Sequence, residues 1–169
     1  MKQSSKIFRR GNVWDLFYII GIILSLALAI LFGGYMLNAF KTNVFNNATI
    51  NETYSTTFVE NAVQKYNTSF DNMFLFVFIL LNLSIVLSAF LIKSSPIFIV
   101  LFILAIIGIV LFSLIAYEIY SYITNTYEIH EISIIFPKVN WIMEHYGLLM
   151  GIISVIVLFA LISNFGGEL

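Results

Sequence analysis

The stretch that decides the fold is MFLFVFILLNLSIVLSAFLIKSSPIFIVLF, residues 73–102. It is almost wholly apolar up to residue 92, is interrupted by KSSP at 93–96, and becomes apolar again at once. Pro96 suits the first position of a helix, where its missing N–H is not needed, and the residue before a proline is biased away from the helical conformation. The sequence therefore predicts two membrane-spanning helices joined by a tight hairpin at 93–96.

The composition of the whole chain agrees with a membrane protein. The chain has 169 residues, of which 60% are hydrophobic and 10% charged, and its mean hydropathy is +0.98. Soluble domains carry roughly 25% charged residues, and a spanning helix needs about 20 apolar residues. Four segments are suitable and contain no charged residue or histidine: 16–37, 73–92, 97–117 and 146–163. We expect an all-α integral membrane fold with four transmembrane helices.

Basic residues predict how the chain is oriented. The N-terminal segment 1–15 contains Lys2, Lys6, Arg9 and Arg10. Positive charge beside a first span favours the cytoplasmic or inner side, and four spans return the C-terminal tail, 164–169, to that side. A basic start followed by an apolar run resembles a signal peptide, but this run continues to Leu37 and is too long for one. We expect it to be retained as the first span.

Two regions are then expected on the outer side, 38–72 and 118–145. The first half of region 38–72 is rich in asparagine and threonine, which predicts a loop, whereas its second half has apolar residues at helical spacing. We expect an outward amphipathic helix between spans 1 and 2, either lying on the bilayer or packed against a neighbour. Its apolar stripe is the candidate contact with a partner protein: Phe58, Val59, Val63, Tyr66 and Phe70. A cover for the ends of the chain's own bundle is the alternative.

The sequence offers no pattern for catalysis or cofactor binding. There is no cysteine, no glycine-rich phosphate loop and no recognisable catalytic triad, and a net charge of −1 gives no reason to expect nucleic-acid binding. The segment EIHE at 128–131 lacks the two histidines four residues apart of zinc proteases. We therefore expect Glu128, His130, Glu131, Glu144 and His145 to be hydrated interface residues rather than metal ligands. We predict no enzyme activity, no cofactor and no metal.

The absence of ionisable residues from the spans bears on transport. Pumps and coupled transporters usually need such groups inside the membrane, so these classes are disfavoured, while an uncharged pore stays open. Asn82 lies in the middle of the second span. We expect it to form a hydrogen bond across the bundle, and a pore-lining amide is the alternative.

Small residues at helical spacing are the candidates for close helix packing. They are Gly21, Ser25 and Ala29 in the first span, Ser84 and Ser88 in the second, Gly108 in the third, and Gly147 and Gly151 in the fourth.

The layout resembles a known group of proteins. The basic N-terminus, the four short-looped spans and the interfacial segments AYEIY (116–120) and FPKVNWIMEHYG (136–147) are similar to small multi-pass membrane proteins of tailless, membrane-containing phages and related prokaryotic viruses. The resemblance covers roughly residues 70–162. It implies a virion or virus-encoded membrane protein without catalysis, and it transfers no functional residue.

These observations favour a non-enzymatic structural or assembly protein. It would lie in a virion or cell membrane as an oligomer and anchor an outer layer of capsid-type or other membrane proteins. The alternatives are a holin-like or small-channel pore-former and an accessory subunit of a cellular membrane complex.

Overall fold

The structure is a computed structural model that describes residues 13–46, 53–91 and 96–163. Six α-helices follow one another along the described chain: α1 (Val13–Asn46), α2 (Thr53–Leu91), α3 (Pro96–Thr124), α4 (Tyr127–Ile135), α5 (Pro137–Glu144) and α6 (Tyr146–Ser163). These ranges contain no strand. The predicted all-α fold is therefore confirmed.

Four of these helices are long and apolar enough to cross a membrane. The candidate spans are Phe17–Asn43, Thr57–Leu91, Ile99–Thr124 and Tyr146–Ser163. They contain the four segments predicted from the sequence, apart from a few terminal residues, and identify the chain as a multi-pass membrane protein. The predicted hairpin between the second and third spans falls almost wholly outside the described residues.

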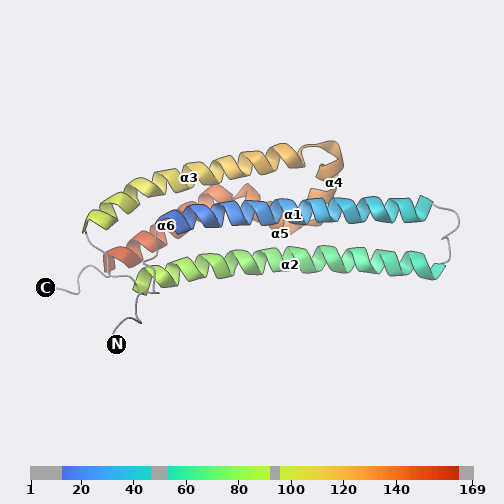
Figure 1. Ribbon diagram of the computed structural model, residues 1–169, viewed down its shortest axis with the longest axis horizontal. Helices are drawn as coiled ribbons and strands as arrows, with labels where there is room; N and C mark the ends of the chain where they lie inside the picture. Colours follow the sequence, from blue (N-terminus) through green and yellow to red (C-terminus); the bar gives the residue numbers. More distant parts are fainter. Residues whose placement is uncertain (1–12, 47–52, 92–95, 164–169) are drawn as a thin grey trace, which may run out of the picture.

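The region between the first two spans differs from the prediction. Instead of giving way to a loop after Leu37, α1 continues to Asn46. The predicted amphipathic segment is helical, but it forms the first half of α2 rather than a separate helix lying flat (Figure 1). Residues 53–91 contain neither glycine nor proline, so no residue breaks the helix where it leaves the apolar part.

The outward region 118–145 is also more regular than a loop. The third span extends to Thr124, and two short helices, α4 and α5, occupy most of the remainder. Pro137 lies in the first turn of α5, a position that proline favours.

Figure 1 shows how the helices are arranged. The two longest helices, α1 and α2, lie side by side and antiparallel, and α3 and α6 pack against them. The beginning of α1 and the end of α6 lie at one end of the bundle, whereas α4 and α5 fold back onto α1 and α2 nearer the other end. The α1–α2 pair continues past α4 as the longest part of the molecule.

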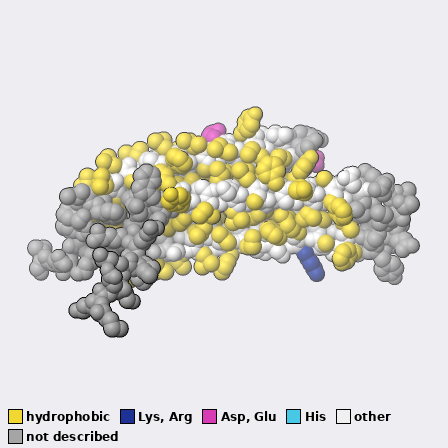
Figure 2. Space-filling view, viewed as in Figure 1, with side chains coloured by type: hydrophobic (Ala, Val, Ile, Leu, Met, Phe, Trp, Pro, Cys, Tyr) yellow, Lys and Arg dark blue, Asp and Glu magenta, His cyan; other side chains and the backbone are white. Residues whose placement is uncertain are grey.

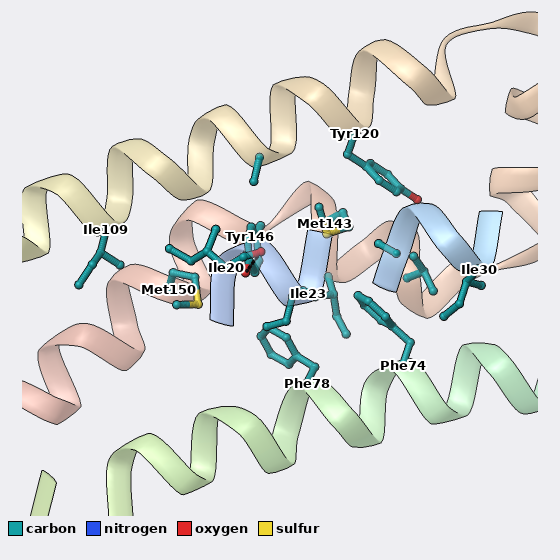
Figure 3. Close-up of a cluster of buried hydrophobic side chains, with 14 of the residues drawn as sticks. Ile20, Ile23, Ile30, Phe74, Phe78, Ile109, Tyr120, Met143, Tyr146 and Met150 are labelled. Atoms are coloured by element: carbon teal, nitrogen blue, oxygen red, sulfur yellow. Dashed lines mark hydrogen bonds between the residues drawn. The ribbon is translucent and has the colours of Figure 1, made fainter. Parts of the chain in front are cut away.

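The core lies between these helices. Figure 3 shows Phe74 and Phe78 of α2 pointing toward Ile20 and Ile23 of α1, with Tyr146 of α6 close by. The outer surface is also strongly apolar (Figure 2), and the few charged side chains visible on that face lie near its margins. In lipid such a surface needs no cover, because hydrocarbon tails are as apolar as the side chains.

Candidate functional site: a polar pocket between α3, α4 and α5

A pocket of about 160 Å³ lies where α3, α4 and α5 meet. Its lining is almost entirely polar or tyrosyl: Tyr117, Tyr120, Ser121, Thr124, Asn125, His130, Ser133, Asn140 and Glu144. This concave, polar site contrasts with the apolar outer surface of the candidate spans. We regard it as the candidate functional site.

Helical spacing explains why these side chains converge. The α3 residues stand three or four positions apart, from Tyr117 to Thr124, and therefore share one face of that helix. In α5, Asn140 and Glu144 are also one turn apart. The chain turns sharply after Thr124, where the Asn125 N–H donates to the Ser121 carbonyl at 3.0 Å, and this turn brings α4 back over the end of α3.

A short chain of hydrogen bonds crosses the pocket. The Tyr120 hydroxyl donates to Asn140 Oδ1 at 3.4 Å, and Asn140 Nδ2 donates to Glu144 Oε1 at 2.9 Å. Tyr120 is buried, whereas Glu144 is exposed. This chain links α3 to α5 and fixes a carboxylate at the side of the pocket that faces solvent.

The remaining lining groups are held by local bonds. Thr124 Oγ1 donates to the Tyr120 carbonyl at 3.1 Å, and Ser133 Oγ donates to the His130 carbonyl at 2.8 Å. Each hydroxyl oxygen keeps lone pairs that can accept a hydrogen bond from a ligand.

The residues weighed as metal ligands are separated in the structure. His130 and Glu144 both line the pocket, but the ring of His145 stacks on Trp141 with centroids 4.8 Å apart. Glu131 is exposed and outside the pocket lining, and the side chain of Glu128 lies outside the described residues. Among the described side chains, no three His, Cys, Asp or Glu residues are placed to hold a metal ion.

Asp71 holds α5 in place beside the pocket, a role that the sequence did not suggest. This α2 residue is 5% exposed, and its Oδ1 accepts the backbone N–H groups of Lys138 and Val139, each at 3.0 Å. Both N–H groups belong to the first turn of α5, where they lack partners within the helix. Phe136, the residue before α5, supplies no side-chain cap. The carboxylate of another helix therefore caps α5 from a distance in sequence.

The neighbouring Asn72 strengthens this attachment. Its Oδ1 accepts a hydrogen bond from Lys138 Nζ. The only sequence signal for the Asp71 contact was indirect, since α5 begins with FPK and has no residue that caps helices well.

Two glycines of α1 form another close contact that sequence reasoning missed. A Cβ at Gly34 would lie 2.7 Å from a ring carbon of Phe136, and a Cβ at Gly33 would overlap the Tyr66 hydroxyl. Tyr66 stacks on Phe70, with ring centroids 4.1 Å apart, and meets Phe136 edge-on at 6.4 Å. The Gly33–Gly34 pair thus lets aromatic side chains from α2 and the α4–α5 junction approach the backbone of α1.

Three of the predicted packing glycines lie at helix contacts. A Cβ at Gly147 would lie 2.8 Å from Leu114, one at Gly108 would lie 3.3 Å from Phe17, and one at Gly151 would lie 3.8 Å from Val110.

The other predicted small-residue positions face outward. A Cβ added at Gly21 would meet no atom within 4 Å, and all five positions are exposed: Gly21, Ser25, Ala29, Ser84 and Ser88. The face of α1 that packs inside the chain instead carries Ile20, Ile23 and Ala27. Spacing alone identified small-residue faces but could not tell which of them meets another helix.

Asn82 is buried, with 6% exposure, but it does not bridge helices as expected. Its Nδ2 donates to the Phe78 carbonyl one turn earlier in α2, at 2.7 Å. Its Oδ1 has no hydrogen-bond partner in the described part of the chain. The amide satisfies its donor locally, as asparagine side chains often do.

The predicted partner-contact residues divide into two groups. Phe58 is 74% exposed, and Val59 and Val63 are half-buried. Tyr66 and Phe70 instead pack against the core, so they are engaged within the chain itself.

Comparisons with known protein families, with curated proteins and with solved structures find no match to this chain. Its function is therefore inferred from the geometry described above.

Proposed function

We propose that this protein is a non-enzymatic structural component of a membrane assembly and that the α1–α2 hairpin contacts proteins outside the bilayer. The observation that carries the proposal is the length of these two helices. They have 34 and 39 residues, about 51 and 58 Å at 1.5 Å per residue, whereas the hydrocarbon core is about 30 Å thick. The 18 residues of α6 correspond to about 27 Å. Even at a tilt of about 40°, α1 and α2 would span about 39 and 44 Å along the membrane normal, so both extend beyond the hydrocarbon core.

The projecting portion, residues 35–46 and 53–65, is called the arm below. Its base is the contact between Gly33 and Tyr66. Lys41 and Glu60 form an ion pair across it at 3.8 Å. Polar, exposed side chains such as Asn61 and Gln64 also lie on it, which suits a helical pair in water.

Among the described side chains of the arm, three large apolar ones interrupt this polar surface. Met36, Phe40 and Phe58 are 72%, 59% and 74% exposed. Aromatic residues and methionine are enriched at protein interfaces, and aromatic anchors often dominate their binding energy. The arm is therefore the part of the chain best suited to hold a partner protein.

The setting favoured by the sequence resemblance is a virion membrane, in which the arm would anchor a capsid-type layer. The same geometry would serve a subunit of a cellular membrane complex. A pore-former is less well supported, because Asn82 is buried and its amide N–H bonds to its own helix.

Single substitutions on the arm test the proposal. Phe40→Asp and Phe58→Asp should leave membrane insertion intact, since both side chains are exposed and outside the core. We expect them to detach the protein from its native complex, because a carboxylate would replace an apolar contact. Asn61→Asp adds the same charge at an exposed position of the arm and should leave the complex unchanged.

The measurement is co-elution in mild detergent, with carbonate extraction of membranes as the check on insertion. Retention of both phenylalanine variants in the large complex would show that the arm is not the contact, and the proposal would fail.

A further inference from the structure

We propose that the pocket between α3, α4 and α5 binds a primary ammonium group carried on a short polar chain, of the ethanolamine type. Such a group occurs both in soluble amines and in lipid headgroups. The inference is independent of the proposed structural role, since the pocket lies beside the base of the arm rather than on its exposed apolar residues.

The charge of the pocket lining favours a cationic ligand. The lining contains one carboxylate, that of Glu144, and neither lysine nor arginine. A phosphate or carboxylate ligand would meet no permanent positive charge here, and Glu144 would repel it. A cation gains that carboxylate as a partner.

The hydrogen-bonding capacity of the pocket is the second argument. Asn140 Nδ2 holds Oε1 of Glu144 and leaves Oε2 available for a charge-assisted bond. The hydroxyl oxygens and amide oxygens around it can accept the other N–H groups of an ammonium ion. Tyr117 and Tyr120 also offer aromatic rings, and rings attract cations within about 6 Å of their centres.

The volume of the pocket limits the size of the ligand. A cavity of about 160 Å³ resembles the roughly 150 Å³ engineered cavity that accommodates benzene, so it suits a group of about six heavy atoms. Ethanolamine, with four heavy atoms, fits, and a second hydroxyl or ester oxygen on the ligand can use the serine and threonine side chains. A purely apolar ligand of that size would leave the polar lining without partners.

The position of the pocket is consistent with both sources of the ligand. It opens at the end of α3, where Tyr117, Tyr120 and Tyr122 lie close together in sequence. Tyrosines at the end of a span mark the depth of lipid headgroups. A lipid amine and a soluble amine can both reach this depth.

Three ligands of similar size, with four or five heavy atoms, and of different charge test the proposal on the full-length protein in detergent. They are ethanolamine, neutral ethylene glycol and anionic glycolate, compared at equal ionic strength by saturation-transfer NMR and by the shift in unfolding temperature. We expect ethanolamine to bind at least tenfold more tightly than ethylene glycol, and glycolate not to bind. Equal binding of the three, or no binding of ethanolamine, overturns the proposal.

Two variants locate the site. Glu144→Gln keeps the shape of the side chain and should weaken ethanolamine binding at least tenfold, while Glu118→Gln, at an exposed α3 position outside the pocket, should not. Circular dichroism and the unfolding temperature without ligand show that both variants are folded. If Glu144→Gln binds ethanolamine as well as the unmodified protein does, the proposed site is wrong.

Nanodiscs distinguish the source of the amine. Phosphatidylethanolamine should raise the unfolding temperature above that in phosphatidylcholine, whose methylated nitrogen has no N–H donor, and Glu144→Gln should abolish the difference if the natural ligand is a lipid. A Glu144-dependent effect of free ethanolamine alone identifies a soluble amine. If neither ligand gives a Glu144-dependent effect, the proposal fails.

Discussion

At the scale of single residues, whether a glycine of α1 makes a close helix contact depends on which other helix lies opposite it. Gly34 and Gly21 lie on the same helix, yet a Cβ added at Gly34 would clash with Phe136 and Ile132, whereas one added at Gly21 would meet no atom within 4 Å. The spacing of small residues predicted that α1 has faces suited to close packing. Which of these faces packs against other helices depends on where α4 and α5 lie against α1, and the spacing within α1 contains no information about that.

Replacing each of these glycines with leucine should affect the stability of the protein differently. Gly34→Leu forces a side chain against a buried aromatic ring, and such overpacking costs about 1–3 kcal/mol. Gly21→Leu adds a side chain in open space and should change stability little or increase it slightly through better helix propensity. Titration of the folded protein with sodium dodecyl sulfate in mixed micelles measures both. Equal stability of the two variants would contradict the contact at Gly34.

At the scale of secondary-structure elements, the apolar runs were sufficient to locate every span but not to set the ends of the helices. The first two helices extend past their apolar portions because no glycine or proline ends them and because each packs against the other. The sequence indicated a loop in the region rich in asparagine and threonine, whereas residues 38–46 and 53–56 of that region are helical and are stabilised by tertiary contacts. The middle of the predicted loop, 47–52, lies outside the described residues. The pocket could not be predicted from the sequence either. Its side chains come from three helices, and the relative positions of these helices depend on the turn after Thr124 and on Asp71.

The attachment of α5 through Asp71 gives a prediction for one element. Asp71→Ala removes the acceptor of two backbone N–H groups in the first turn of α5. Loss of a helix cap costs about 0.5–2 kcal/mol, and leaving buried N–H groups without partners adds to this. We expect faster hydrogen exchange at Lys138 and Val139 together with a stability loss of about 2 kcal/mol, combined from these terms.

The matched control for this prediction is Asn72→Ala. It removes only the exposed bond to Lys138 Nζ and should cost less than about 1 kcal/mol. If the Asp71 variant exchanges at the same rate as the control, the long-range cap does not stabilise α5.

At the scale of the whole molecule, the number of spans and their alternating directions follow from the sequence, and the side on which each end lies remains a prediction. The four basic residues before α1 predict an inner N-terminus. Even so, Figure 1 shows the beginning of α1 and the end of α6 at one end of the bundle and the arm at the other.

Cysteine labelling tests this orientation on an otherwise cysteine-free chain. The variants Asn43→Cys, Asn125→Cys and Ser163→Cys all place a thiol at an exposed position. A membrane-impermeant maleimide added to intact cells should label the first two and should label Ser163→Cys only after the membrane is opened. Labelling of all three in intact cells, or of Ser163→Cys alone, would contradict the predicted orientation.

The bond between Asp71 and α5 also has a consequence for the order in which the protein is made. The N–H groups that Asp71 binds lie 67 and 68 residues later in the chain. During synthesis α2 and α3 are therefore complete before this carboxylate meets its partners, and until then it needs water. We therefore expect the attachment of α5 to α2 to form late in biogenesis, after the first three spans have been synthesised.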